Sequence, residues 1–206
     1  AEVLKRATLL GQGVPNYYGE QRFGINGGNL ALAQQLFNGQ SITDRKLRGL
    51  ALSAARSYVF NQQVSARISS GLFNTVQDGD VLQLNGSGSV FRVPEADTTL
   101  QQRLQQHDLH ITAVLAGIGE PMVSGAAAEF ERQVLAQHNE LVQGLEDYRL
   151  KAERRAIRLL PQQLTVQQQG NDITVSFALP AGCFATSVLR ELLKYRDCGR
   201  KSVDME

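Results

Sequence analysis

Apolar residues recur at helical spacing in several parts of the chain, and the longest such pattern covers residues 43–70. Thr43 or Asp44 can begin this helix as its N-cap, and Gly71 ends it. A shorter pattern runs from a cap at Asn29 to about Phe37, and another covers residues 1–10. The latter has no cap and no methionine before it, so the chain reads as part of a longer protein. The apolar face of the longest helix is formed by Leu47, Leu50, Ala54, Tyr58, Val64 and Ile68.

Elsewhere the apolar residues alternate with polar ones, which is the period of a β-strand. Alternation on both sides of residues 85–88 predicts a β-hairpin between Asp78 and Val93. Three further strands are expected at residues 110–115, 164–167 and 173–177, the last two joined by a turn at Gly170-Asn171. Helical spacing returns at residues 98–107, 126–160 and beyond Gly182. This order predicts an α+β fold, with Pro161 as the best internal boundary.

Four basic residues near the end of the 126–160 pattern bear on possible partners. Lys151, Arg154, Arg155 and Arg158 stand at i, i+3, i+4 and i+7, so a helix would place all four on one face. Such a face is either an ordinary solvated helix surface or a surface that binds RNA phosphates.

Composition narrows the class of protein. A chain of 206 residues with 42% hydrophobic residues can form a proper core, and a net charge of +1 does not by itself indicate a polyanion partner. Cys183 and Cys198 lack metal-ligand spacing and a neighbouring histidine, which argues against zinc and against a disulfide framework. No apolar run approaches the ~18 residues of a membrane span. We therefore expect a soluble, cytoplasmic protein with no metal.

Residues 13–24, GVPNYYGEQRFG, follow no period and combine glycines with tyrosines and an arginine. Their composition fits either a loop whose aromatic residues fill the core or a loop that faces a ligand. The sequence of this segment resembles the P-N-Y-F-G-x-Q-R-F-G motif of the TruD family of tRNA pseudouridine synthases, with Tyr18 where the family usually has phenylalanine. We call residues 13–24 the signature loop. The positions that match are Pro15, Asn16, Tyr17, Gly19, Gln21, Arg22, Phe23 and Gly24.

Three other segments resemble motifs of the same family. Residues 53–61 are similar to a helix motif that ends in L-F-N, and residues 78–80 are similar to its D-G-D. Residues 179–191 resemble its L-P-x-G-S-[FY]-A-T-x-x-x-R-E, with Cys183 in place of the usual serine. The resemblance extends over nearly the whole chain, but it corresponds only to the later part of a TruD protein.

The resemblance implies an architecture and a partner. Residues 14–160 would form the mixed helix and strand TRUD insertion domain, while residues 1–13 and 161–206 would belong to the pseudouridine-synthase catalytic sheet. The implied partner is tRNA, bound by a monomer without a cofactor because the isomerisation is redox-neutral. We expect Asn16, Tyr18 and Arg22 to line the cleft between the domains and Arg190 to lie near the working end of the catalytic sheet. The RNA-binding candidates are Asn16, Tyr18, Gln21, Arg22, Arg190, Lys151, Arg154, Arg155 and Arg158.

The catalytic aspartate of the family lies in a G-x-K-D motif, and this sequence contains neither that motif nor G-N-x-F. We expect Asp78 and Asp80 to be structural turn residues, and we expect the same of Cys183. The scattered histidines His107, His110 and His138 suggest no ligand set. These 206 residues alone are therefore expected to lack synthase activity. The alternatives are a non-catalytic RNA-binding module and a purely structural α+β protein.

Overall fold

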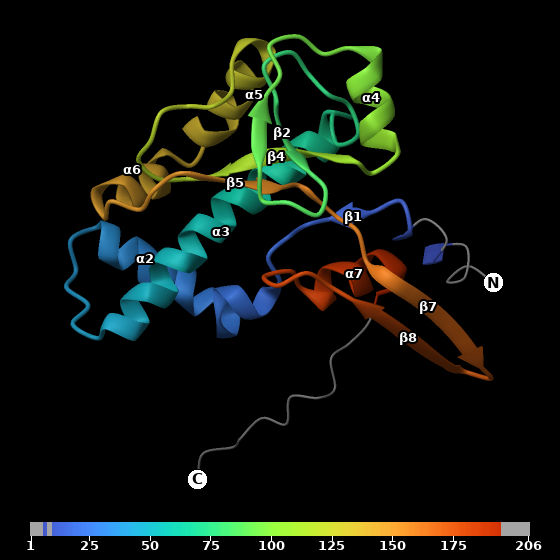
Figure 1. Ribbon diagram of the computed structural model, residues 1–206. Helices are drawn as coiled ribbons and strands as arrows, with labels where there is room; N and C mark the ends of the chain where they lie inside the picture. Colours follow the sequence, from blue (N-terminus) through green and yellow to red (C-terminus); the bar gives the residue numbers. More distant parts are fainter. Residues whose placement is uncertain (1–5, 8–9, 195–206) are drawn as a thin grey trace.

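A computed structural model describes residues 6–7 and 10–194 of the chain, and it mixes helices with three antiparallel sheets (Figure 1). The expected first helix therefore lies mostly outside the described residues, as does the tail from Tyr195 onward. In chain order the helices are η1 (Glu20–Phe23), η2 (Ile25–Gly27), α2 (Gly28–Phe37), α3 (Arg45–Ser69), α4 (Thr98–Gln105), α5 (Gly125–Ala136), α6 (Asn139–Asp147) and α7 (Ala185–Leu192). The strands are β1 (Val14–Pro15), β2 (Val81–Leu84), β3 (Val90–Arg92), β4 (Leu109–Leu115), β5 (Glu153–Ala156), β6 (Arg158–Leu159), β7 (Gln162–Gln169) and β8 (Asp172–Ala178).

The largest sheet has the strand order β3-β2-β4-β5, and all its neighbouring strands are antiparallel. The hairpin predicted around residues 85–88 is confirmed as β2 and β3, with Gly86 at φ 71° in the turn. Strand β4 occupies a central position, and six of its seven residues are buried. The alternating pattern of the sequence is therefore sufficient to locate three of the four strands.

Helix α3 packs against this sheet and also against α2 and α6 (Figure 1). The Asp44 carboxylate caps its first turn by accepting hydrogen bonds from the Lys46 and Leu47 amides, so Asp44 is the cap of the two candidates, Thr43 and Asp44, that the sequence offered. Its C-terminal half contributes Phe60 and Val64 to the core beneath the sheet. Ala51, Ala55 and Val59, on successive turns of the same helix, belong to a second core that α3 shares with α2 and α6. One 25-residue helix thus holds two cores together.

The prediction of helix from residue 126 to 160 is wrong after Asp147. Helices α5 and α6 account for its first part, but residues 153–156 form edge strand β5. This strand pairs with β4 from Leu115↔Glu153 to Thr112↔Ala156. The face shared by Lys151, Arg154, Arg155 and Arg158 therefore does not exist. The cause is tertiary: hydrogen bonding to a strand forty positions away overrides the local helical pattern.

Two smaller expectations also need correction. The residue before α2 is Gly27, in the left-handed conformation at φ 76°, and the Asn29 side chain donates to the Arg22 carbonyl instead of capping the helix. Pro161 lies in the two-residue connection between β6 and β7 and has no helix to end.

The C-terminal part forms the long hairpin of β7 and β8 followed by α7, and the hairpin extends away from the largest sheet (Figure 1). Its inward residues Leu164, Val175 and Phe177 pack against a third core that includes Val14 and Val188. Both the strand pair and the final helix agree with the sequence. None of the helices in residues 6–7 and 10–194 is long and apolar enough to cross a membrane.

Candidate nucleic-acid interface

The signature loop begins as strand β1, where Val14 pairs with Leu159 and Pro15 with Arg158 of β6. It then turns through the short helix η1 and leaves at Gly24, with φ 77°. Gly19 sits so close to the start of α7 that an added Cβ would lie 2.5 Å from the Thr186 hydroxyl and 3.0 Å from the Phe184 ring. This position requires glycine because the loop and the C-terminal segment approach each other at van der Waals distance.

Asn16 lies at the base of the loop and is only 5% exposed. Its backbone amide donates to the Ile157 carbonyl at 2.8 Å, and its Nδ2 donates to the Ala156 carbonyl at 2.8 Å. Its Oδ1 accepts a hydrogen bond of 2.8 Å from Arg155 Nη2. Because both side-chain polar groups are paired and buried, Asn16 anchors the loop to β5 in this structure.

The two tyrosines connect the loop to α3 and to α7. The Tyr17 hydroxyl lies 3.0 Å from Ser65 Oγ, while the Tyr17 carbonyl accepts a 2.7 Å hydrogen bond from Ser187 Oγ. The Tyr18 amide donates to Asn61 Oδ1 at 2.9 Å, and Asn61 Nδ2 donates back to the Tyr18 carbonyl at 3.0 Å. The Asn61 side chain therefore pairs with the loop backbone as a neighbouring strand would.

The half-buried Tyr18 ring is the centre of a cluster of aromatic rings and guanidinium groups. Phe60 and Phe184 meet it edge to face, each with its ring centroid 5.6 Å away. The Arg155 guanidinium lies 4.3 Å from the ring centroid and that of Arg22 lies at 5.3 Å. These five residues come from four separate segments, and such cation–π contacts are favourable when partly buried.

Arg22 and Arg155 each donate hydrogen bonds to the protein, and each also has one buried donor without a partner in the part of the chain that the structure describes. Arg22 Nη1 donates to Ser53 Oγ at 2.7 Å, and Arg155 Nη2 donates to Asn16 and to the Gly182 carbonyl at 3.0 Å. Among the described residues, the buried Nε atoms of both arginines and the Thr186 hydroxyl have no hydrogen-bond partner. Both arginines are half-buried. Each therefore makes a structural contact, and each carries a guanidinium group, the planar fork of donors that suits phosphate.

Cys183 lies beside this cluster, and no described base is positioned to activate it. Burial raises the pKa of the Cys183 thiol, and the nearby Arg155 guanidinium only partly counteracts this effect. A thiol with a raised pKa is a poor nucleophile at neutral pH. The contacts therefore support the structural interpretation of Cys183.

The remaining RNA-binding candidates separate into exposed and buried residues. Gln21, Lys151 and Arg190 are exposed. Arg154 is buried and bonded to Glu131, and Arg158 is buried and donates to the Leu104 and Leu109 carbonyls. Arg154 and Arg158 thus serve the interior of the protein, which corrects the expectation that they share an exposed basic face.

The D-G-D segment lies apart from the signature loop. Asp80 is completely buried and forms an ion pair with Arg67, and Asp78 accepts a 2.7 Å hydrogen bond from the Ala96 amide. These contacts support a structural role for both aspartates.

Among the histidines, burial and the nearby Arg158 lower the pKa of His110 to about 4.

Sequence reasoning missed the importance of Arg155 as the residue that joins Asn16, Tyr18 and Gly182. It also missed the serines Ser53 and Ser187, although both lie inside segments whose motifs had been noticed. The motifs could have indicated these serines, because residues 53–61 and 179–191 both contact the signature loop. Three of the four motif segments therefore meet at Tyr18.

The structure thus defines an α+β protein in which three motif segments meet at one aromatic residue, and comparisons with known proteins identify its family. The family model described as tRNA pseudouridine synthase D (TruD) matches residues 29–192. The chain therefore belongs to the TruD family.

Curated relatives support this assignment. The tRNA pseudouridine synthase D of Colwellia psychrerythraea is 47% identical over 199 residues, which cover 92% of this chain and 54% of that protein. The protein of the same name from Aeromonas salmonicida is 50% identical over 183 residues, 89% of this chain and 52% of that protein. This chain spans about half the length of these relatives.

A solved structure from Methanosarcina mazei that carries the TruD name has a similar fold. Its TM-score is 0.65 at 18% identity, with 92% of this chain and 63% of that chain covered. At this identity the likeness concerns the fold, which agrees with the predicted α+β class.

Proposed function

We propose that the protein to which this chain belongs isomerises a uridine of tRNA to pseudouridine, and that the signature loop forms part of its RNA-binding cleft. The observation that carries the proposal is the meeting of three motif segments at Tyr18, with Arg22 and Arg155 on its ring. Aromatic and guanidinium groups of this kind stack on unpaired bases and bind phosphates. A base must leave its stack before the reaction, and binding of the surrounding RNA offsets that cost.

We further propose that the 206 residues alone are inactive, because the sequence lacks the G-x-K-D aspartate of the family. In this proposal residues 14–160 form the insertion domain, and residues 1–13 and 161–206 belong to the catalytic part. The proposed protein acts as a cytoplasmic monomer without a metal or cofactor. The relatives' name, tRNA pseudouridine synthase D, supports tRNA as the substrate.

The exposed candidates Gln21, Lys151 and Arg190 are the proposed RNA contacts, whereas Asn16, Arg154 and Arg158 support the fold. For Arg22 and Arg155 we propose both roles: each fixes the loop through a hydrogen bond, and each half-buried guanidinium group also binds phosphate. Tyr18 would act mainly by holding both guanidinium groups in place.

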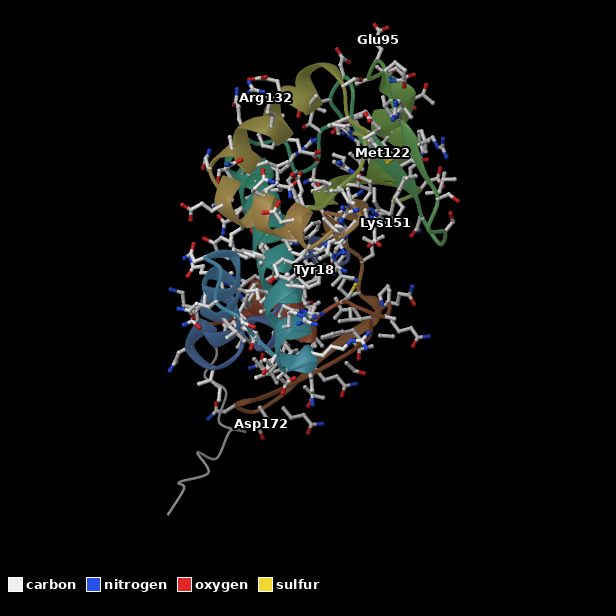
Figure 2. All side chains as sticks on the ribbon, turned by 90° about the vertical axis from the view of Figure 1, so that its left-hand side faces the viewer. Tyr18, Glu95, Met122, Arg132, Lys151 and Asp172 are labelled. Atoms are coloured by element: carbon white, nitrogen blue, oxygen red, sulfur yellow. The ribbon has the colours of Figure 1, made fainter. Side chains whose placement is uncertain are left out.

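A binding titration tests this assignment. Fluorescence anisotropy with an unmodified tRNA transcript should show affinity that decreases with salt, and Arg190→Ala should reduce the slope by about one counterion. Arg132→Ala is the matched control because Arg132 is exposed on α5, away from Tyr18 (Figure 2). Equal loss of affinity in both variants, or affinity that does not change with salt, would reject the proposed interface.

Arg22 needs a separate comparison of affinity with stability. We expect Arg22→Ala to weaken tRNA binding about 10- to 150-fold, the equivalent of a lost charge-assisted contact of about 1.5–3 kcal/mol. The free energy of unfolding should fall by less than the binding free energy. Arg22→Lys retains the charge but loses the planar fork, so it should recover only part of the affinity. Unchanged affinity together with lost stability would make Arg22 a purely structural residue.

A further inference from the structure

A pocket of about 610 Å³ lies on the α5–α6 side of the protein, and nothing in the proposed RNA interface uses it. It is bounded by the end of β4, the loop at residues 116–123, helices α5 and α6, and the start of β5. Its walls include the apolar side chains of Val114, Met122, Leu135 and Val142. This volume is within the range of sites that hold small organic molecules, about 300–1,000 Å³.

The pocket and the signature loop are reached by neighbouring residues of β5 that point in opposite directions. Arg155 extends to the Tyr18 ring, whereas Arg154 lines the pocket. Successive residues of a strand face opposite sides of a sheet, so the side chains of Arg154 and Arg155 extend to different faces. Figure 2 shows Arg132, another pocket residue, at the α5 end of the molecule and apart from Tyr18.

The two arginines that line the pocket are already neutralised. Arg154 Nη1 bonds both carboxylate oxygens of Glu131, at 2.7 and 2.9 Å, and its Nε and Nη2 donate to Thr112. The Arg132 guanidinium is bonded to the Glu129 carboxylate at 2.7 Å. Among the described residues that line the pocket, no cation is left without a carboxylate partner.

Carboxylates, in contrast, remain available. Glu120, Glu146 and Glu153 also line the pocket. Glu153 has one ion-pair contact, at 3.5 Å from Arg56, and it is 63% exposed. For the carboxylates of Glu120 and Glu146, the described residues supply no ion-pair partner. The pocket therefore combines apolar walls with a negative potential that repels phosphates and attracts cations.

We propose that this pocket binds an organic ammonium compound that has an apolar body, with the ammonium group next to Glu120 and Glu146. The apolar body would be held by Met122, Leu135 and Val142, and the ion pair of Arg154 with Glu131 would form a polar floor. Such a ligand matches both properties of the pocket, whereas a nucleotide or an anionic lipid headgroup matches neither. None of the residues that line the pocket is a proposed RNA contact.

Methionine NMR offers a direct test because the chain has two methionines, Met122 in the pocket and Met205 near the chain end. With isotope-labelled methionine methyl groups, phenylbutylamine should shift the Met122 signal saturably. The neutral analogue phenylbutanol should bind at least about threefold more weakly, the ratio expected for one modest ion pair. The anionic analogue phenylbutyrate should bind more weakly still.

Two variants separate charge from shape. Glu120→Gln combined with Glu146→Gln should lower the affinity for the amine to that for the alcohol, with the affinity for the alcohol unchanged. Ala136→Phe places a ring at the pocket from an exposed position of α5, so it should block all three compounds without lowering the melting temperature. Equal affinity for amine and alcohol, binding retained in Ala136→Phe, or no saturable shift at Met122 would overturn the proposal.

Discussion

The side-chain amide of Asn61 is paired with both backbone hydrogen-bonding groups of Tyr18, at 2.9 Å to the amide and 3.0 Å to the carbonyl. A helix side chain thereby fixes the conformation of a loop that is 43 positions away in sequence. This contact holds the backbone of the residue whose ring meets Arg22 and Arg155.

Replacement of Asn61 by alanine should therefore destabilise the protein by about 1–3 kcal/mol, because two partly buried peptide groups lose their partner. Urea unfolding followed by circular dichroism measures this loss. Gln102→Ala, at an exposed position of α4, is the control and should change stability by less than about 0.5 kcal/mol. A similar small change for Asn61→Ala would contradict the assigned role.

Asp80→Asn should cause a larger loss, about 3–5 kcal/mol, because it leaves the buried Arg67 guanidinium without its counter-charge. Asp108→Asn provides a matched control, since Asp108 pairs with Arg103 at 2.6 Å but is 52% exposed. Exposed ion pairs contribute at most about 1 kcal/mol. Equal stability of the two variants in denaturant unfolding would show that the buried pair contributes no more than the exposed one.

Two glycine to alanine substitutions in helices should have opposite effects. In α6, a Cβ at Gly144 would lie 2.3 Å from the Phe37 ring, so Gly144→Ala should destabilise by about 1–3 kcal/mol through overpacking. In α3, a Cβ at Gly49 meets nothing within 4 Å, so Gly49→Ala should stabilise by up to about 1 kcal/mol through helix propensity. Melting temperatures that move in the same direction for both would contradict the packing at Gly144.

Acidification should destabilise the protein through His110. Burial first, and then Arg158 and His107, lower the pKa of His110 to about 4 in the folded state, below the ordinary value of 6.5. The unfolded chain therefore binds more protons between these values, and the contribution to stability present above pH 6.5 is lost as the pH falls toward 4.

The measurement is the free energy of unfolding at several pH values across this window. His110→Gln removes the titrating group, so its stability should vary less with pH than that of the wild type. A pH dependence identical in the two proteins would assign the effect to other groups. Burial also lowers the pKa of His138, so the pH dependence of stability in His138→Gln is measured for comparison.

The parts of the fold that local patterns determine could be predicted from the sequence. Asp44 marks the start of α3, and Gly86 marks the turn of β2 and β3, because caps and tight turns depend on residues close together in the chain. Residues 151–158 could not be predicted in this way. Their arginines stand at helical spacing by coincidence, and pairing with β4 determines their structure.

The candidate interface was predictable in location but not in detail. Motif resemblance identified residues 13–24, 53–61 and 179–191 as segments of interest, and the structure brings them together. Nothing local, however, indicates that Asn16 is buried or that Arg155 rests on Tyr18, because both depend on contacts about 140 positions apart. Chemistry of residue types alone could not separate exposed Arg190 from buried Arg158.

The long sequence separation of these contacts has a consequence for biosynthesis. During synthesis, the Asn16 side chain cannot form its hydrogen bond until Ala156 has been added. The Tyr17 carbonyl cannot form its own until Ser187, 170 positions later, has been added. Helix α3 and the β2–β3 hairpin can form while the ribosome is still elongating the chain, because their contacts are local. The signature loop can reach the conformation seen here only after α7 has left the ribosomal exit tunnel.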